Sequence, residues 1–155
     1  MAAQGFKSEL QRALARPDSL VMVRQIDAFI AHHENGDGEW PEEHAEDFSE
    51  IISCFDCDPE KALAYVVITA ARTDNAEFLG LMGCSNLENV LRDPSPELLQ
   101  RIVAEARRSA RFGWLLSNPF KVAVSKQAWE AIKPFRITGP HEEPSRDTLS
   151  SRDTF

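Results

Sequence analysis

The chain has 155 residues, a formal net charge of −8 and 43% hydrophobic residues. This length allows one domain whose core needs no disulfide or metal, and the negative charge argues against nucleic acid and anionic membranes as partners. Three cysteines make no secretory disulfide framework, and the N-terminal segment carries no export signal, so we expect a cytoplasmic protein.

Helical periodicity runs through most of the chain. Apolar residues recur three and four positions apart, as at Ala45, Phe48 and Ile52, while period-two alternation is almost absent. We therefore predict an all-α fold, a compact bundle or short HEAT-like solenoid of about six to eight helices. The expected helices are 6–15, 19–33, 42–55, 59–73, 76–82, 86–92, 96–112 and 126–134.

Local chemistry marks several helix starts. Asp58 and Ser95 each precede a proline, which is typical of an N-cap followed by proline at the first helical position. Ser125 is placed to cap the last helix. The segment 59–73 is apolar on nearly all sides, which predicts the central helix.

The stretch from Phe78 to Asp93 is expected to be a joint between two helices. Gly83 is predicted to end the first helix in a left-handed conformation. Ser85 and Glu88 have the spacing of a capping box that begins the second helix.

The end of the chain changes in composition. Residues 137–155 are rich in Pro, Ser, Thr and charge, with little to bury. We predict a single helical domain over 1–136 and a flexible or disordered tail over 137–155.

Charge is distributed unevenly along the sequence. From Glu34 to Glu60 there are eleven acids and no Lys or Arg, whereas Arg101 to Arg136 holds eight bases. On helix 42–55 the acids lie opposite or beside the apolar face and form a stripe, next to a tryptophan that can act as an aromatic anchor. The predicted partner-binding residues are Trp40, Glu42, Glu43, Glu46, Asp47 and Glu50.

Such a stripe favours a basic protein surface as partner. The main alternative is that the acidic helix lies against Arg107, Arg108 and Arg111 and is neutralised within the chain. Self-association, with the acidic half of one copy against the basic half of another, is a further alternative.

Cys54 and Cys57 form a C-x-x-C pair, which can be a redox couple or half of a zinc site. The flanking Asp56 and Asp58 raise the pKa of a thiol, and no second C-x-x-C supplies further ligands. The two cysteines are therefore weak candidates for metal or redox chemistry, and we expect no cofactor. The alternative function that they leave open is a thiol- or zinc-dependent sensor or enzyme.

Part of the sequence also resembles a calcium-binding loop. Asn35, Asp37, Glu39 and Glu46 have nearly the spacing of an EF-hand, but Trp40 stands where the loop needs glycine. A solvated turn between helices is the preferred interpretation.

Three motifs carry a resemblance to a known family. They are a glycine followed by Leu-Glu-x-x-Leu, an Ile-x-x-Glu-Ala segment ending in Phe, and a final tryptophan helix. Their residues are Gly83, Leu87, Glu88 and Leu91; Ile102, Glu105, Ala106 and Phe112; and Trp129. Together they resemble a family of small bacterial all-helical proteins of uncharacterised function. The resemblance implies an all-helical fold and no particular activity.

The leading interpretation is a non-enzymatic bacterial interaction protein of the immunity or adaptor type. It would use the acidic helical face to bind a basic protein partner, and no catalytic residue is expected.

Overall fold

A computed structural model describes residues 8–36 and 38–151. These ranges are mostly helical and contain no strand, so the all-α prediction is confirmed. The α-helices are α1 (Glu9–Leu14), α2 (Ser19–Glu34), α3 (Ala45–Ser53), α4 (Pro59–Arg72), α5 (Ala76–Met82), α6 (Glu88–Val90), α7 (Pro96–Arg108), α8 (Ala110–Leu116) and α9 (Lys126–Ile132). The shorter elements are the π-helix η4 (Gly83–Leu87) and the 3-10 helices η2 (Glu42–His44), η3 (Cys54–Asp56), η5 (Lys121–Ala123), η6 (Lys133–Phe135) and η7 (Arg146–Thr148). The first two residues of the predicted helix 6–15 lie outside the described ranges.

Helix α4 is the central element, as the sequence predicts. Nine of its residues are buried, and α1, α2, α3 and α5 all pack against it. The helix begins where expected, because the Asp58 carboxylate accepts a hydrogen bond from Lys61 N at 3.0 Å and Pro59 follows the cap. Ser95 and Ser125 cap α7 and α9 in the same way.

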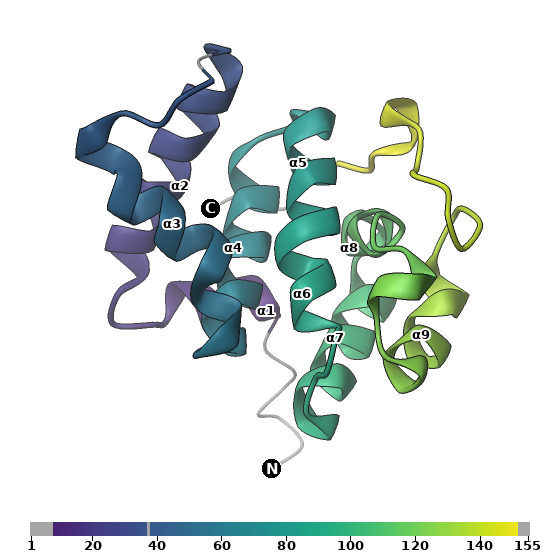
Figure 1. The fold of residues 1–155 in the computed structure, drawn as a ribbon. Coiled ribbons are helices and arrows are strands. Elements are labelled where there is room, and N and C mark those ends of the chain that lie inside the picture. Colours follow the sequence, from purple (N-terminus) through teal and green to yellow (C-terminus); the bar gives the residue numbers. More distant parts are fainter. Residues whose placement is uncertain (1–7, 37, 152–155) are drawn as a thin grey trace.

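Helices α5 and α6 form one rod, joined without interruption by η4. The rod stands in the middle of the molecule, with α1 to α4 on one side and α7 to α9 on the other (Figure 1). Both halves of the molecule can therefore pack against the rod.

The predicted helix 96–112 is in fact two helices. Ser109 has extended backbone angles, φ −130° and ψ 113°, and its hydroxyl accepts from Phe112 N at 3.1 Å to begin α8. The change of direction carries the Arg111 side chain into the protein, where it donates to Ala70 O at 2.9 Å and Thr73 O at 2.6 Å. Satisfying these buried carbonyls is the physical reason for the break.

The described part of the predicted tail rests on the helical body. Trp114 Nε1 donates to Ser145 O and to Thr148 Oγ1, both at 3.1 Å, and Pro144 is buried. The remaining residues of the predicted tail lie outside the described ranges. The flexibility of this segment stays a prediction. It can be tested by removing the hydrogen bonds that the Trp114 indole makes to the segment.

Candidate functional site

Trp40 lies at the edge of an aromatic cluster. Its ring meets the rings of Phe48 and Phe29 edge-on, with centroids 5.7 and 6.1 Å apart, while His44 stacks on Phe48 at 5.4 Å. Phe48 is fully buried, and Trp40 remains 39% exposed. The indole is therefore held in place on one side and open to solvent on the other, as a binding anchor requires.

An open groove of about 700 Å³ lies between this cluster and the rod. Trp40 and Ile52 line it on one side and Leu81 on the other, and the buried rings of Phe29 and Phe78 line its inner part. Ile52 is 37% exposed and Leu81 43%. None of the described residues that line the groove is a lysine or arginine.

Four groove residues follow one another along the rod at intervals of four: Glu77, Leu81, Ser85 and Asn89. At a rise of about 1.5 Å per residue this row extends for about 18 Å. A step of four residues overshoots one α-helical turn of about 3.6 residues, and the wider turn of η4 offsets that drift. The π segment thus keeps the row on one side of the rod.

The prediction of a joint at Gly83 is wrong. Gly83 is right-handed helical, with φ −66° and ψ −43°. The Ser85 hydroxyl donates to Leu81 O within the rod and caps no helix, and the Glu88 carboxylate accepts from Phe120 N at 3.2 Å. The physical reason is that η4 continues the backbone hydrogen bonding through the segment where a cap was expected.

The glycine is explained by a close approach. A Cβ at Gly83 would lie 2.8 Å from Asn118 Cβ and 2.9 Å from Leu115 O. Asn118 is itself fixed, because its Nδ2 donates to Trp114 O and Leu115 O at 3.0 and 3.2 Å. Only a residue without a side chain lets the end of α8 pack this tightly against the rod.

A buried amide joins α3 to the rod. Asn86, 1% exposed, donates from Nδ2 to Ile51 O at 2.7 Å. The neighbours of these two residues, Ser85 and Ile52, both line the groove. This hydrogen bond therefore ties α3 to the rod next to the groove.

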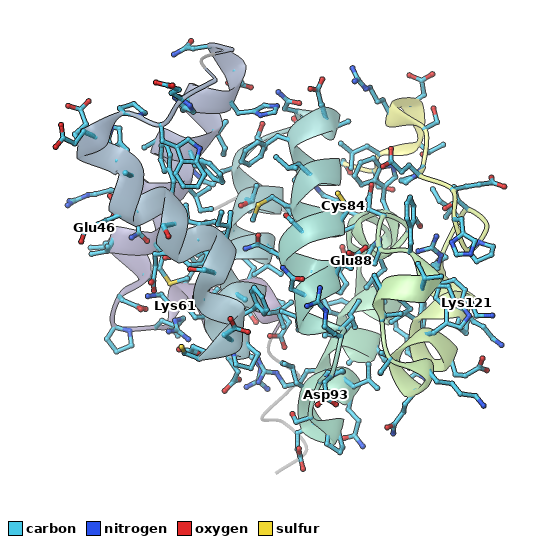
Figure 2. All side chains as sticks on the ribbon, viewed as in Figure 1. Glu46, Lys61, Cys84, Glu88, Asp93 and Lys121 are labelled. Carbon is cyan, nitrogen blue, oxygen red and sulfur yellow. The ribbon has the colours of Figure 1, made fainter. Side chains whose placement is uncertain are left out.

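Three exposed carboxylates on η2 and α3 form what we call the acidic stripe: Glu42, Glu43 and Glu46. Within the described chain no lysine or arginine makes an ion pair with them, and one basic side chain that lies close to them is that of His44, with Nε2 3.9 Å from Glu43 Oε1. Glu46 lies on the outer side of α3, far across the molecule from Lys121 (Figure 2). The stripe is thus available to an external cation.

The other two predicted stripe residues are engaged within the chain. Asp47 Oδ1 accepts from Gln25 Nε2 at 3.0 Å, and Glu50 Oε1 lies 2.7 Å from Lys61 Nζ. Burial alone would lower the pKa of Lys61, but the hydrogen bond and charge of Glu50 outweigh it and the pKa is raised. Asp47 and Glu50 therefore stabilise the fold around α3.

The sequence matches a family of unknown function, DUF6869, over residues 34–139. The chain belongs to the DUF6869 family. The matched region contains Trp40, the acidic stripe, Ile52 and the whole rod, while α1 and most of α2 precede it. No curated protein and no solved structure gives a match.

Two of the arginines that could have neutralised the acidic helix of this DUF6869 member contact other groups. Arg108 pairs with the buried Glu105 on its own helix. Arg111, 5% exposed, donates to the carbonyls of Ala70 in α4 and Thr73 just after it, and pairs with the carboxylate of Asp74. The described ion pairs of Arg108 and Arg111 are therefore with Glu105 and Asp74 and not with the stripe.

The two cysteines of the C-x-x-C pair differ in environment. Cys54 is 6% exposed, and its Sγ donates to Ile51 O at 3.9 Å, whereas Cys57 is exposed. Burial, helped by the charge of Glu50, raises the pKa of Cys54 to about 12. This direction opposes the thiolate that redox or metal chemistry needs.

Metal ligands are not brought together in the described part of this DUF6869 protein. Within residues 8–36 and 38–151, no three His, Cys, Asp or Glu side chains are grouped to hold an ion. Asp37 of the calcium-like pattern lies outside the described residues. No helix in these ranges is both long enough and apolar enough to cross a membrane.

The groove was not predicted from the sequence. The apolar spacing placed Ile52 in the buried face of its helix, but the buried residues of α3 are Phe48 and Ile51. Ile52 is the next residue along the helix, and it lines the groove together with Leu81. One sequence feature could have indicated the groove. Leu81 lies four residues from both Glu77 and Ser85, so this large apolar side chain shares a helix face with polar residues, unlike a residue of a buried face.

Proposed function

We propose that this DUF6869 protein is a non-enzymatic interaction protein, of the immunity or adaptor type, that binds a basic protein surface. The acidic stripe and Trp40 are the contact residues. The observation that carries the proposal is their combination: three exposed carboxylates that no described lysine or arginine pairs with, beside a fixed and half-exposed indole.

The two parts of the surface have different physical roles. An exposed charge pair contributes only about 0.2–1 kcal/mol, so the stripe acts mainly on encounter rate and on rejection of acidic partners. A tryptophan buried at an interface contributes about 2 kcal/mol or more. We therefore assign affinity chiefly to Trp40 and selectivity to the stripe.

The test is affinity capture from a lysate of the source organism, with bound proteins identified by mass spectrometry. One variant reverses all three stripe residues to Lys. The matched control reverses Asp93, Glu97 and Glu143, which are also exposed and lie outside η2 and α3. Both variants change the net charge by the same amount.

We expect the stripe variant to lose a basic partner that the wild type and the control variant retain. Circular dichroism should show the same helical content in all three proteins. Equal capture by the stripe variant would contradict the proposal, as would equal loss by the control variant.

A further inference from the structure

The C-terminal part of the chain contains a short sequence repeat. Residues 145–149 are Ser-Arg-Asp-Thr-Leu, and residues 151–155 are Ser-Arg-Asp-Thr-Phe. The two copies share four identical residues in the same order, and each ends on a large apolar residue. The structure describes the whole first copy, whereas residues 152–155 of the second lie outside the described ranges. The contacts of the first copy therefore indicate what the second can bind.

The indole of Trp114 contacts the first copy from α8. Its Nε1 donates to Ser145 O and to Thr148 Oγ1, both at 3.1 Å. The segment presents these two oxygens together, because Ser145 caps the single turn of η7 and its Oγ accepts from Asp147 N at 3.3 Å. The Thr148 hydroxyl also donates to Ser145 O at 2.5 Å. The indole thus binds a serine and a threonine three positions apart, and both copies have this pair.

Two further contacts fix the first copy on the helical body. Arg146 Nη2 lies 3.1 Å from Glu77 Oε2 on α5, and Leu149 packs half-buried against the core. Figure 1 shows the segment, in yellow, leading from the region of α9 toward α5. The second copy has an arginine and a large apolar residue at the matching positions, Arg152 and Phe155. It therefore carries the same kinds of side chain with which the first copy binds.

We propose that α5 and α8 form a binding site for a Ser-Arg-Asp-Thr-apolar segment, and that residues 151–155 of the same chain are its second occupant. The second copy takes the site when the first copy leaves it. Such an exchange keeps Trp114 covered while it releases residues 145–149. The site is separate from the acidic stripe, so it stands or falls independently of the proposed function.

The connection to the site is long enough for this exchange. The chain before the first copy is held at Glu142, whose carbonyl accepts two side-chain hydrogen bonds. Two residues separate Glu142 from Ser145, and eight separate it from Ser151. Closing a loop of eight residues instead of two is about eightfold less probable. The bond from Arg111 Nη1 to Ser150 O, at 2.6 Å, adds to the advantage of the first copy. The first copy is therefore the main occupant and the second its replacement.

The experiment uses the full chain, with the indole proton of Trp114 as the reporter. NMR measures the solvent exchange of this proton and its nuclear Overhauser contacts to threonine methyl groups, and the spectrum of Trp114→Phe identifies its resonance. The first-copy variant is Arg146→Glu with Thr148→Ala. The second-copy variant, Arg152→Glu with Thr154→Ala, makes the same chemical changes six positions later and is the matched control. A third protein combines both pairs.

In the wild type and in the second-copy variant, we expect the indole proton to contact the methyl group of Thr148. In the first-copy variant this contact should pass to the methyl group of Thr154. In the combined variant both contacts should be absent, and the proton should exchange about tenfold faster or more, because no segment covers the indole. Arg146 and Thr148 are exposed, so circular dichroism should show the same helical content in all four proteins.

Three outcomes would overturn the inference. Equally fast exchange in the first-copy and combined variants, without a contact to Thr154, would show that the second copy does not occupy the site. A contact to Thr154 that is lost on dilution, with a dimer seen by sedimentation, would assign the site to the second copy of a neighbouring chain. Slow exchange in the combined variant would mean that groups outside the shared motif hold the segment.

Discussion

The substitution Gly83→Ala tests the revised role of this glycine in the rod. Alanine would gain about 1 kcal/mol of helix propensity over glycine. Its Cβ would meet Asn118 Cβ at 2.8 Å and the Leu115 carbonyl at 2.9 Å. Overpacking costs about 1–3 kcal/mol, and contact with a backbone atom places this case near the upper end. The net expected loss is about 2 kcal/mol in the free energy of unfolding.

Gly80→Ala is the matched control in the same rod. Its Cβ would meet only the end of the Asn118 side chain, at 3.2 Å, so its packing cost and propensity gain should nearly cancel. Urea unfolding followed by circular dichroism measures both variants, and Gly83→Ala should also lower Tm by about 4–8 °C.

Gly83→Asn decides between the two explanations of the glycine. Asparagine tolerates the left-handed conformation of a helix C-cap, so a cap would accept it with little loss. Close packing against α8 instead predicts that Asn is at least as damaging as Ala. Wild-type stability of Gly83→Asn, or of Gly83→Ala, would refute the packing argument.

Two further predictions concern the thiols and the C-terminal segment. Burial raises the pKa of Cys54 to about 12 from 9.0, so this thiol ionises in the unfolded chain at a lower pH than in the folded protein. The stability that the neutral thiol confers is therefore complete below about pH 9. Between about pH 9 and about pH 12 it falls by up to about 1.4 kcal/mol per pH unit. Cys54→Ala should make this decline shallower in urea unfolding at high pH, while Tyr65 and Lys61, whose pKa values are also raised, keep part of it. Cys57→Ala should leave the decline as in the wild type, and an identical decline in both variants would contradict the assignment. Trp114→Phe removes the indole donor to Ser145 O and Thr148 Oγ1, which should cost about 1 kcal/mol and speed proteolysis after residue 140. Unchanged cleavage would mean that these bonds do not hold the segment.

Much of the helical framework was predictable, because its signals are local. Asp58 with Pro59, Ser95 and Ser125 each make the cap that their spacing indicates. The apolar run in 59–73 identifies the central helix, since such a helix is stable only when it is surrounded by others.

The errors lie where distant contacts override a local rule. Gly83 has the sequence signature of a helix end, but its neighbour in space is Asn118, 35 positions away. One alternative placed Arg111 against the acidic helix, whereas its side chain donates to the carbonyls of Ala70 and Thr73 inside the protein. The groove could not be predicted from the sequence either, because the residues that line it come from segments that are far apart in the sequence.

The amide of Asn86 has a consequence for how rigidly α3 is held against the rod. Because its bond to Ile51 O is short and shielded from water, separating α3 from the rod means leaving two polar groups without partners. Separation of α3 from the rod is therefore costly, and under the proposed function a partner would meet a surface that is already formed. Binding at such a surface would cost the protein little entropy, and the shape of the partner would then decide which partner fits.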